Sequence, residues 1–157
     1  MRRLAFAALS LAFLATACQP ATTELTDEQK AVIEEAVREA STEYTQFFHA
    51  EDINSYMSAA SDWAGSPWPC CGTLDGLRSA ITDLLNGWTF EEFENGEMKV
   101  TVLGPDAAVV AFAQTGVQVD TAGVRLETAL DIAFLWVREA GQWRLVMGKD
   151  YSHPVGT

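Results

Sequence analysis

The C-terminal part of the chain alternates between apolar and polar residues over two long runs, residues 124–137 and 143–151, with Gly141 in the short turn between them. Alternation with a period of two is typical of β-strands, because successive side chains point to opposite faces of a sheet. A short Gly-containing connection between two such runs predicts an antiparallel hairpin. We therefore expect the rest of the chain to extend and cover this sheet.

Upstream of the hairpin, the same period predicts further strands over residues 88–94, 97–103 and 107–119. Before residue 88 the pattern is helical. Thr26 and Gln29 form a capping box that opens a helix to about Phe48. Asp52 is placed to cap a short second helix, and Thr73 a third one that runs to about residue 85. Three helices followed by a strand meander predict an α+β fold, with the helices packed on a strongly curved antiparallel sheet.

The N-terminus has the features of an export signal. Arg2 and Arg3 precede an apolar stretch, residues 4–14, that is too short to span a bilayer as a helix. Residues 14–18 resemble a bacterial lipoprotein signal in which Cys18 becomes the lipidated first residue, although ordinary cleavage after small residues fits as well. We expect a signal peptide over 1–17, a lipidated tether over 18–25 and one domain over 26–153. Gln19 implies, by the sorting rule of such lipoproteins, the periplasmic face of the outer membrane.

Composition narrows the class of partner. The chain has 157 residues, 48% of them hydrophobic, and a net charge of −12, which becomes −14 if Arg2 and Arg3 are removed with the signal. Such charge repels phosphate backbones and anionic lipid, which argues against nucleic acid and against a membrane contact other than a lipid anchor. No ligand motif for a metal and no cofactor fingerprint is present, so neither is expected.

The segment between the second and third predicted helices combines prolines and glycines with two tryptophans, Trp63 and Trp68. Because large aromatic side chains are costly to leave in water, such a loop is expected to fold over the core or over the mouth of a pocket. Cys70 and Cys71 follow. As neighbours in an oxidising compartment they either close a vicinal disulfide or remain as two thiols.

This layout resembles the nuclear transport factor two-like superfamily, and within it the SnoaL-like and ketosteroid-isomerase-like group. The resemblance covers residues 26–153. It rests on the sequence of residues 47–53 at the end of the first helix, the Pro-containing loop, the strand meander and the turn Gly141-Gln-Trp143 into the last strand. The resemblance implies a cone-shaped fold with a pocket between the helices and the concave face of the sheet. Family members include enzymes, binding proteins and dimers that pair through the outer face of the sheet.

The resemblance also suggests two candidate catalytic residues. Tyr44 lies eight residues before Asp52, the register of the family's oxyanion-hole tyrosine, and Asp131 lies in mid-strand as the family's protonated aspartate does. Small neighbours around Asp131 fit a hollow apolar cavity with one polar anchor, provided that this face of the strand is the concave one. Residues 66–69, where the family carries its base, hold no carboxylate. The alternative is that Tyr44 is a core residue and Asp131 a surface residue in an ion pair.

The predicted pocket residues are Trp63, Trp68, Trp88, Phe48, Ala133 and Asp150. Because the catalytic set is incomplete and the chain carries an export signal, the sequence favours a lipid-anchored binding or accessory protein for a small apolar molecule. Two alternatives stay open. One is an isomerase, cyclase or hydrolase that uses Asp131 and Tyr44, and the other is a homodimeric interaction module of the cell envelope.

Overall fold

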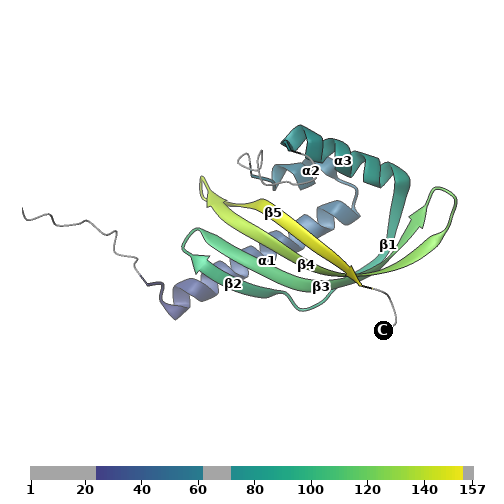
Figure 1. Ribbon diagram of the computed structural model, residues 1–157. Coiled ribbons are helices and arrows are strands. Elements are labelled where there is room, and N and C mark those ends of the chain that lie inside the picture. The colour runs from purple at the N-terminus through teal and green to yellow at the C-terminus, as the bar shows by residue number, and fades with distance from the viewer. Residues whose placement is uncertain (1–23, 62–71, 154–157) are drawn as a thin grey trace, which may run out of the picture.

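A computed structural model describes residues 24–61 and 72–153. Three helices come first: α1 (Asp27–His49), α2 (Ile53–Ser58) and α3 (Leu74–Gly87). Five strands follow: β1 (Trp88–Asn95), β2 (Lys99–Gly104), β3 (Ala107–Asp120), β4 (Arg125–Glu139) and β5 (Gln142–His153). The α+β architecture predicted from the alternating and helical patterns is confirmed, with the helices on one face of a curved antiparallel sheet (Figure 1).

Local sequence explains where the elements begin and turn. The predicted capping box is present at α1: the Thr26 side chain accepts from the Gln29 amide at 3.2 Å, and Gln29 Oε1 accepts from the Thr26 amide at 2.9 Å. Strands β4 and β5 are joined by Ala140 and Gly141, which have φ angles of 49° and 83°. Two successive positive φ angles give the twist that suits a two-residue hairpin loop.

The sheet is antiparallel throughout, in the order β1-β3-β4-β5, and β2 also pairs with β3. Strands β1 and β2 share one edge of β3, because β1 pairs with its C-terminal half and β2 with its N-terminal half. Three irregularities interrupt the ladders: one in β1 between Glu91 and Glu94, one in β2 between Val102 and Gly104, and one in β5 at Val146. Each such bulge shifts the residues that follow it to the opposite face.

The core lies between α1 and the concave face of the sheet. Val37 and Tyr44 of α1 meet Val110 of β3, Trp136 of β4 and Leu145 of β5, all of them buried. The Tyr44 ring lies edge-on to Phe134 and Trp136, with centroids 5.3 and 5.9 Å apart. Aromatic pairs in this arrangement contribute about 0.5–1.5 kcal/mol beyond the area that they bury. The amphipathic stripe of α1 thus fixes the helix to the sheet.

Leu145 tests this packing because its side chain is fully buried. We expect Leu145→Ala to lower the free energy of unfolding by about 2–5 kcal/mol, since the lost methyl groups leave a cavity between α1 and β4. Leu103→Ala is the matched control, because Leu103 is 60% exposed, and it should cost at most about 0.5 kcal/mol. Urea unfolding measures both, and equal effects would contradict the assignment of the core.

Candidate functional site: a pocket in the mouth of the cone

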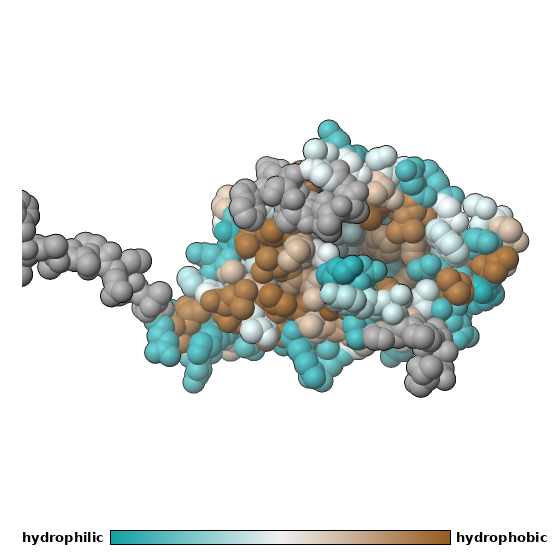
Figure 2. Space-filling model, viewed as in Figure 1, coloured by the Kyte–Doolittle hydropathy of each residue, from teal (hydrophilic) through white to brown (hydrophobic). Residues whose placement is uncertain are grey.

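A pocket of about 350 Å³ lies where the helices and the sheet diverge. Its walls come from all three helices and from β3, β4 and β5. The lining residues are Tyr44, Thr45, Phe48, His49, Tyr56, Leu77, Ile81, Gln114, Leu130, Ile132, Phe134, Gly148, Lys149 and Asp150. Figure 2 shows apolar residues gathered beside α3, where the surface is hollowed. The cone predicted for this fold is therefore hollow, and its volume suits a small organic molecule.

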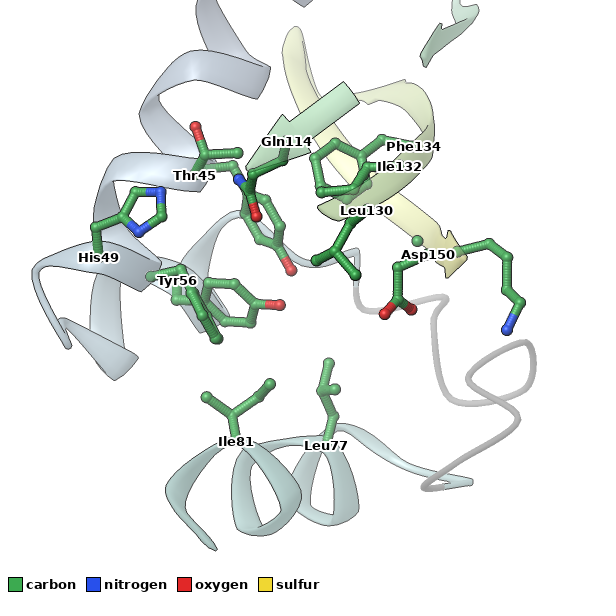
Figure 3. A pocket seen from close by; sticks show the side chains of 14 residues that line it. Thr45, His49, Tyr56, Leu77, Ile81, Gln114, Leu130, Ile132, Phe134 and Asp150 are labelled. Carbon is green, nitrogen blue, oxygen red and sulfur yellow. The ribbon is translucent and has the colours of Figure 1, made fainter. Parts of the chain in front are cut away.

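Most of the wall is apolar. Leu77 and Ile81 of α3 point into the pocket from one side, and Leu130, Ile132 and Phe134 of β4 face them from the other (Figure 3). The three β4 residues are two positions apart, so they lie on the same, concave face of the strand. This face of β4 is the one that also carries Trp136 into the core. The helix α3 and the strand β4 therefore supply the surfaces that would hold an apolar ligand.

Two tyrosines carry their hydroxyls into this apolar space. The rings of Tyr44 and Tyr56 are stacked, with centroids 4.2 Å apart and an angle of 28° between them. Burial raises the pKa of Tyr44 well above its ordinary value, and the hydrogen bond with Tyr56 raises it further. Burial also raises the pKa of Tyr56, to about 12, while its hydrogen bond with Tyr44 acts in the opposite direction.

Asp150 brings a carboxylate to the same part of the pocket. Its negative charge contributes to the raised pKa of Tyr56, and the two side chains point toward each other in Figure 3. The bulge at Val146 puts it there. Because one residue of β5 is unpaired, Gly148 lies opposite Phe134 and Asp150 opposite Ile132, both on the concave face. With uninterrupted alternation from Leu145, residues 147 and 149 would face the pocket instead.

A hydrogen-bonded chain joins β3, β1 and α1 at the back of the pocket. Gln114 Nε2 donates to Asn95 Oδ1 at 2.7 Å, Asn95 Nδ2 donates to Thr45 Oγ1 at 3.1 Å, and the Thr45 hydroxyl donates to the Thr42 carbonyl at 2.9 Å. Gln114 is only 7% exposed. Satisfied networks of this kind hold buried polar side chains in one orientation.

His49 lies on the pocket wall one turn beyond Thr45. Its ring is 4.1 Å from that of Phe93, centroid to centroid, and neither of its nitrogens has a hydrogen-bond partner among the described residues. Burial lowers the pKa of His49, because the charged imidazolium is disfavoured away from water. The neutral ring has one N–H donor and one acceptor, and both nitrogens are buried.

The structure places some of the site residues predicted from sequence in the pocket and others outside it. Tyr44, Phe48 and Asp150 line the pocket. Ala133 and Asp131 lie on the opposite face of β4, where Asp131 is exposed. The expectation that Asp131 meets Tyr44 inside the cavity is therefore wrong. The physical reason is that the other face of β4 carries the larger apolar side chains, whose burial is worth more than that of two alanines.

Trp88 is half-buried at the start of β1, paired with Asp120, and is not among the residues that line the pocket. Trp63, Trp68, Cys70, Cys71 and Cys18 lie outside the described residues. Sequence reasoning did not single out Gln114 or His49. A signal existed for Gln114, since it continues the inward series of Val110 and Phe112 as a polar residue at a buried position.

Comparison with known proteins supports the fold. No protein-family model and no curated protein matches the chain. Among solved structures, a ketosteroid isomerase-like protein from Erwinia carotovora atroseptica has a TM-score of 0.67 at 22% identity, covering 77% of this chain and 96% of that one. A type 2 hexachlorocyclohexane dehydrochlorinase has a TM-score of 0.64 at 11% identity, covering 84% and 100%. An NTF2-like protein with a cystatin-like fold from Novosphingobium aromaticivorans has 0.60 at 15%, covering 83% and 88%.

These likenesses establish a cone of the nuclear transport factor two-like type, and at such identities they establish the fold alone. Two further observations concern the described residues, 24–61 and 72–153. None of their helices is both long and apolar enough to cross a membrane. They contain no cluster of three or more His, Cys, Asp or Glu side chains that could hold a metal ion.

The lowered pKa of His49 predicts a dependence of stability on pH. The unfolded chain binds a proton at the ordinary value of 6.5, whereas the folded protein resists protonation, so folding is favoured above that pH. We expect the melting temperature to fall as the pH is lowered from about 7 to about 5.5, a window above most carboxylate titrations. His49→Phe keeps a ring against Phe93 and should flatten this slope. The control His153→Asn removes the other histidine, and the same slope in all three proteins would contradict the prediction.

Proposed function

We propose that this protein binds a small, largely apolar molecule in the pocket between the helices and the sheet. The observation that carries the proposal is the pocket itself, a hollow of about 350 Å³ with apolar walls and a few polar groups. A space of this volume within a folded protein is normally filled by side chains, since protein interiors rarely keep large voids. Apolar walls with a few placed polar groups are the usual composition of a small-molecule site.

Binding has more support than catalysis. The ketosteroid-isomerase-like mechanism needs an acidic side chain beside Tyr44 in the cavity, and Asp131 lies on the other face of the sheet. The hydroxyl of Tyr44 is hydrogen-bonded with that of Tyr56 rather than with the carboxyl group that this mechanism requires. The neutral His49 is the group that favours an enzyme as the second candidate, since it lines the pocket and an imidazole is the commonest general base of enzymes. Conversion of a bound molecule, lost in a His49→Phe variant, would distinguish this candidate from binding.

The pocket proposal is tested by filling the cavity from α3. Ile81→Trp places an indole in the space between α3 and β4, and we expect it to weaken binding of the neutral probe 2-naphthylmethanol at least about tenfold, because the ring of the probe would have to share that volume. Val32→Trp is the control, since Val32 is 66% exposed on α1. Titration calorimetry measures both. Undiminished binding by the Ile81 variant, or no binding by the unaltered protein, would refute the proposal.

We also propose that the protein is exported and anchored by lipid at Cys18, at the cell envelope and on the periplasmic side of the outer membrane. The support is the apolar stretch 4–14 after Arg2 and Arg3, with Cys18 behind small residues. We expect Cys18→Ser to abolish labelling by a clickable fatty acid and to move the protein from the membrane fraction to the soluble one. Cys70→Ser is the matched control. Membrane retention and labelling unchanged by Cys18→Ser would refute the anchor.

The homodimer implied by the family resemblance is a further proposal, supported by the outer face of the sheet. No helix among the described residues covers this face (Figure 1). It exposes Ala111, Ala113, Met147 and Tyr151, and Met147 and Tyr151 are 41% and 61% accessible. Exposed apolar side chains on an uncovered sheet face favour contact with a partner, and a second copy would cover both surfaces at once. A mass in solution equal to that of one chain would refute the dimer.

A further inference from the structure

The polar groups of the pocket face a ligand mainly with acceptor atoms. Gln114 shows this most clearly, because the chain of hydrogen bonds behind it can run in only one direction. The chain ends at the Thr42 carbonyl, which is able only to accept. The single proton of the Thr45 hydroxyl is used there, so Thr45 must accept from the amide nitrogen of Asn95. The Asn95 oxygen must then accept from the amide nitrogen of Gln114. The carbonyl oxygen of Gln114 is left for the pocket, and Figure 3 shows it directed there.

The tyrosine pair leads to a second acceptor. Tyr44 shares a hydrogen bond with the Tyr56 hydroxyl. That hydroxyl points toward the carboxylate of Asp150 across the pocket (Figure 3). The ionised carboxylate has about four lone-pair positions and no proton to give. Even with one tyrosine hydroxyl beside it, the carboxylate of Asp150 keeps most of its lone-pair positions free to accept hydrogen bonds from a ligand.

The charges around the pocket favour the same kind of ligand as the acceptor atoms do, namely one that is positively charged. Of the lining residues, Lys149, Asp150 and His49 are titratable besides the two tyrosines. Lys149 pairs with Ala133 and so belongs to the outer face of the sheet, where its ammonium lies 5.1 Å from the centre of the Tyr151 ring. His49 is neutral near pH 7, because burial lowers its pKa. Asp150 is thus the charged group that faces the pocket, in a protein of net charge −12, whose field attracts cations.

The rings beside Asp150 add to this preference. Tyr56 and Phe48 are 5.7 Å apart, centroid to centroid, and both line the pocket with Tyr44 and Phe134. The face of an aromatic ring attracts an ammonium group within about 6 Å, most strongly where water is excluded. A cation placed at Asp150 would have a carboxylate on one side and a tyrosine ring nearby, while its apolar part would contact Leu77 and Ile132.

We infer that the ligand of this pocket is a compact apolar molecule that carries a protonated amine, with the ammonium group held by Asp150 and the apolar part enclosed between α3 and β4. This inference rests on the proposed binding function and adds the chemical class of the ligand. A ligand of the same shape with a carboxylate in place of the amine would be repelled by the negative charge of Asp150. It would also find no hydrogen-bond donor at the Gln114 carbonyl oxygen, so we expect it to bind poorly.

Three probes with one ring system separate the two proposals: 2-naphthylmethylamine, 2-naphthylmethanol and 2-naphthoate. Titration calorimetry at pH 7 on the full chain should give an affinity for the amine about tenfold higher than for the alcohol. A difference of this size is expected of a hydrogen bond between charged groups. The carboxylate should bind more weakly than the alcohol. Equal affinities for amine and alcohol would overturn the inference and leave the binding proposal standing, whereas failure of all three probes would overturn both.

Asp150→Asn tests the residue. The amide keeps the shape of the side chain and removes its charge, so the ratio of the amine affinity to the alcohol affinity should fall to about one, and a cooperative thermal melt shows that the variant is folded. Asp131→Asn is the matched control: it removes one negative charge from the outer face of β4, and the amine should keep its advantage. A preference for the amine that survives Asp150→Asn, or that is lost equally in Asp131→Asn, would overturn the assignment to Asp150.

Discussion

Tyr44 is the residue on which the core and the pocket both depend. One side of its ring meets Phe134 and Trp136 of β4, and the other stacks on Tyr56 of α2. The first set of contacts holds α1 on the concave face of the sheet, and the second positions α2. Because the ring is almost fully buried while its hydroxyl bonds with Tyr56, the same side chain ends the apolar core and begins the polar part of the pocket. Movement of α1 along the sheet would disturb both.

Much of the architecture was predictable from sequence, because burial against one face imposes the period of two on strands and the capping box marks the start of α1. The predicted strand over residues 107–119 corresponds to β3 at Ala107–Asp120, and the final hairpin was predicted at the observed turn. The choice of concave face on β4 was harder. Alternation divides the strand into two sets, and the set containing Leu130, Ile132 and Phe134 is larger and more apolar than the one around Asp131. Comparison of buried area between the two sets would have given the correct face.

The bulges in β1 and β5 explain what alternation could not predict. In β1, Glu92 has a φ angle of 52° within the irregular stretch, and Phe90 and Phe93 lie with their rings 5.4 Å apart although strict alternation would separate them. Phe93 then packs against His49, and it lies so close to Gly116 that an added Cβ there would be 2.9 Å from its ring. A side chain larger than hydrogen at position 116 would displace Phe93, so this glycine helps to place the histidine on the pocket wall.

The bulge in β5 has the greater consequence, since it decides both the shape and the charge of the pocket. On the concave face of β5, Leu145 fills the core, Gly148 contributes only backbone opposite Phe134, and Asp150 follows opposite Ile132. The wall therefore recedes beyond Leu145, and the space that opens is bounded by a carboxylate. If Val146 were paired and alternation continued unbroken from Leu145, Met147 and Lys149 would occupy these positions, and the wall would carry a positive charge in place of the carboxylate. One extra residue in an edge strand thus sets the sign of charge that a ligand meets, which no local pattern of residues 142–153 reveals.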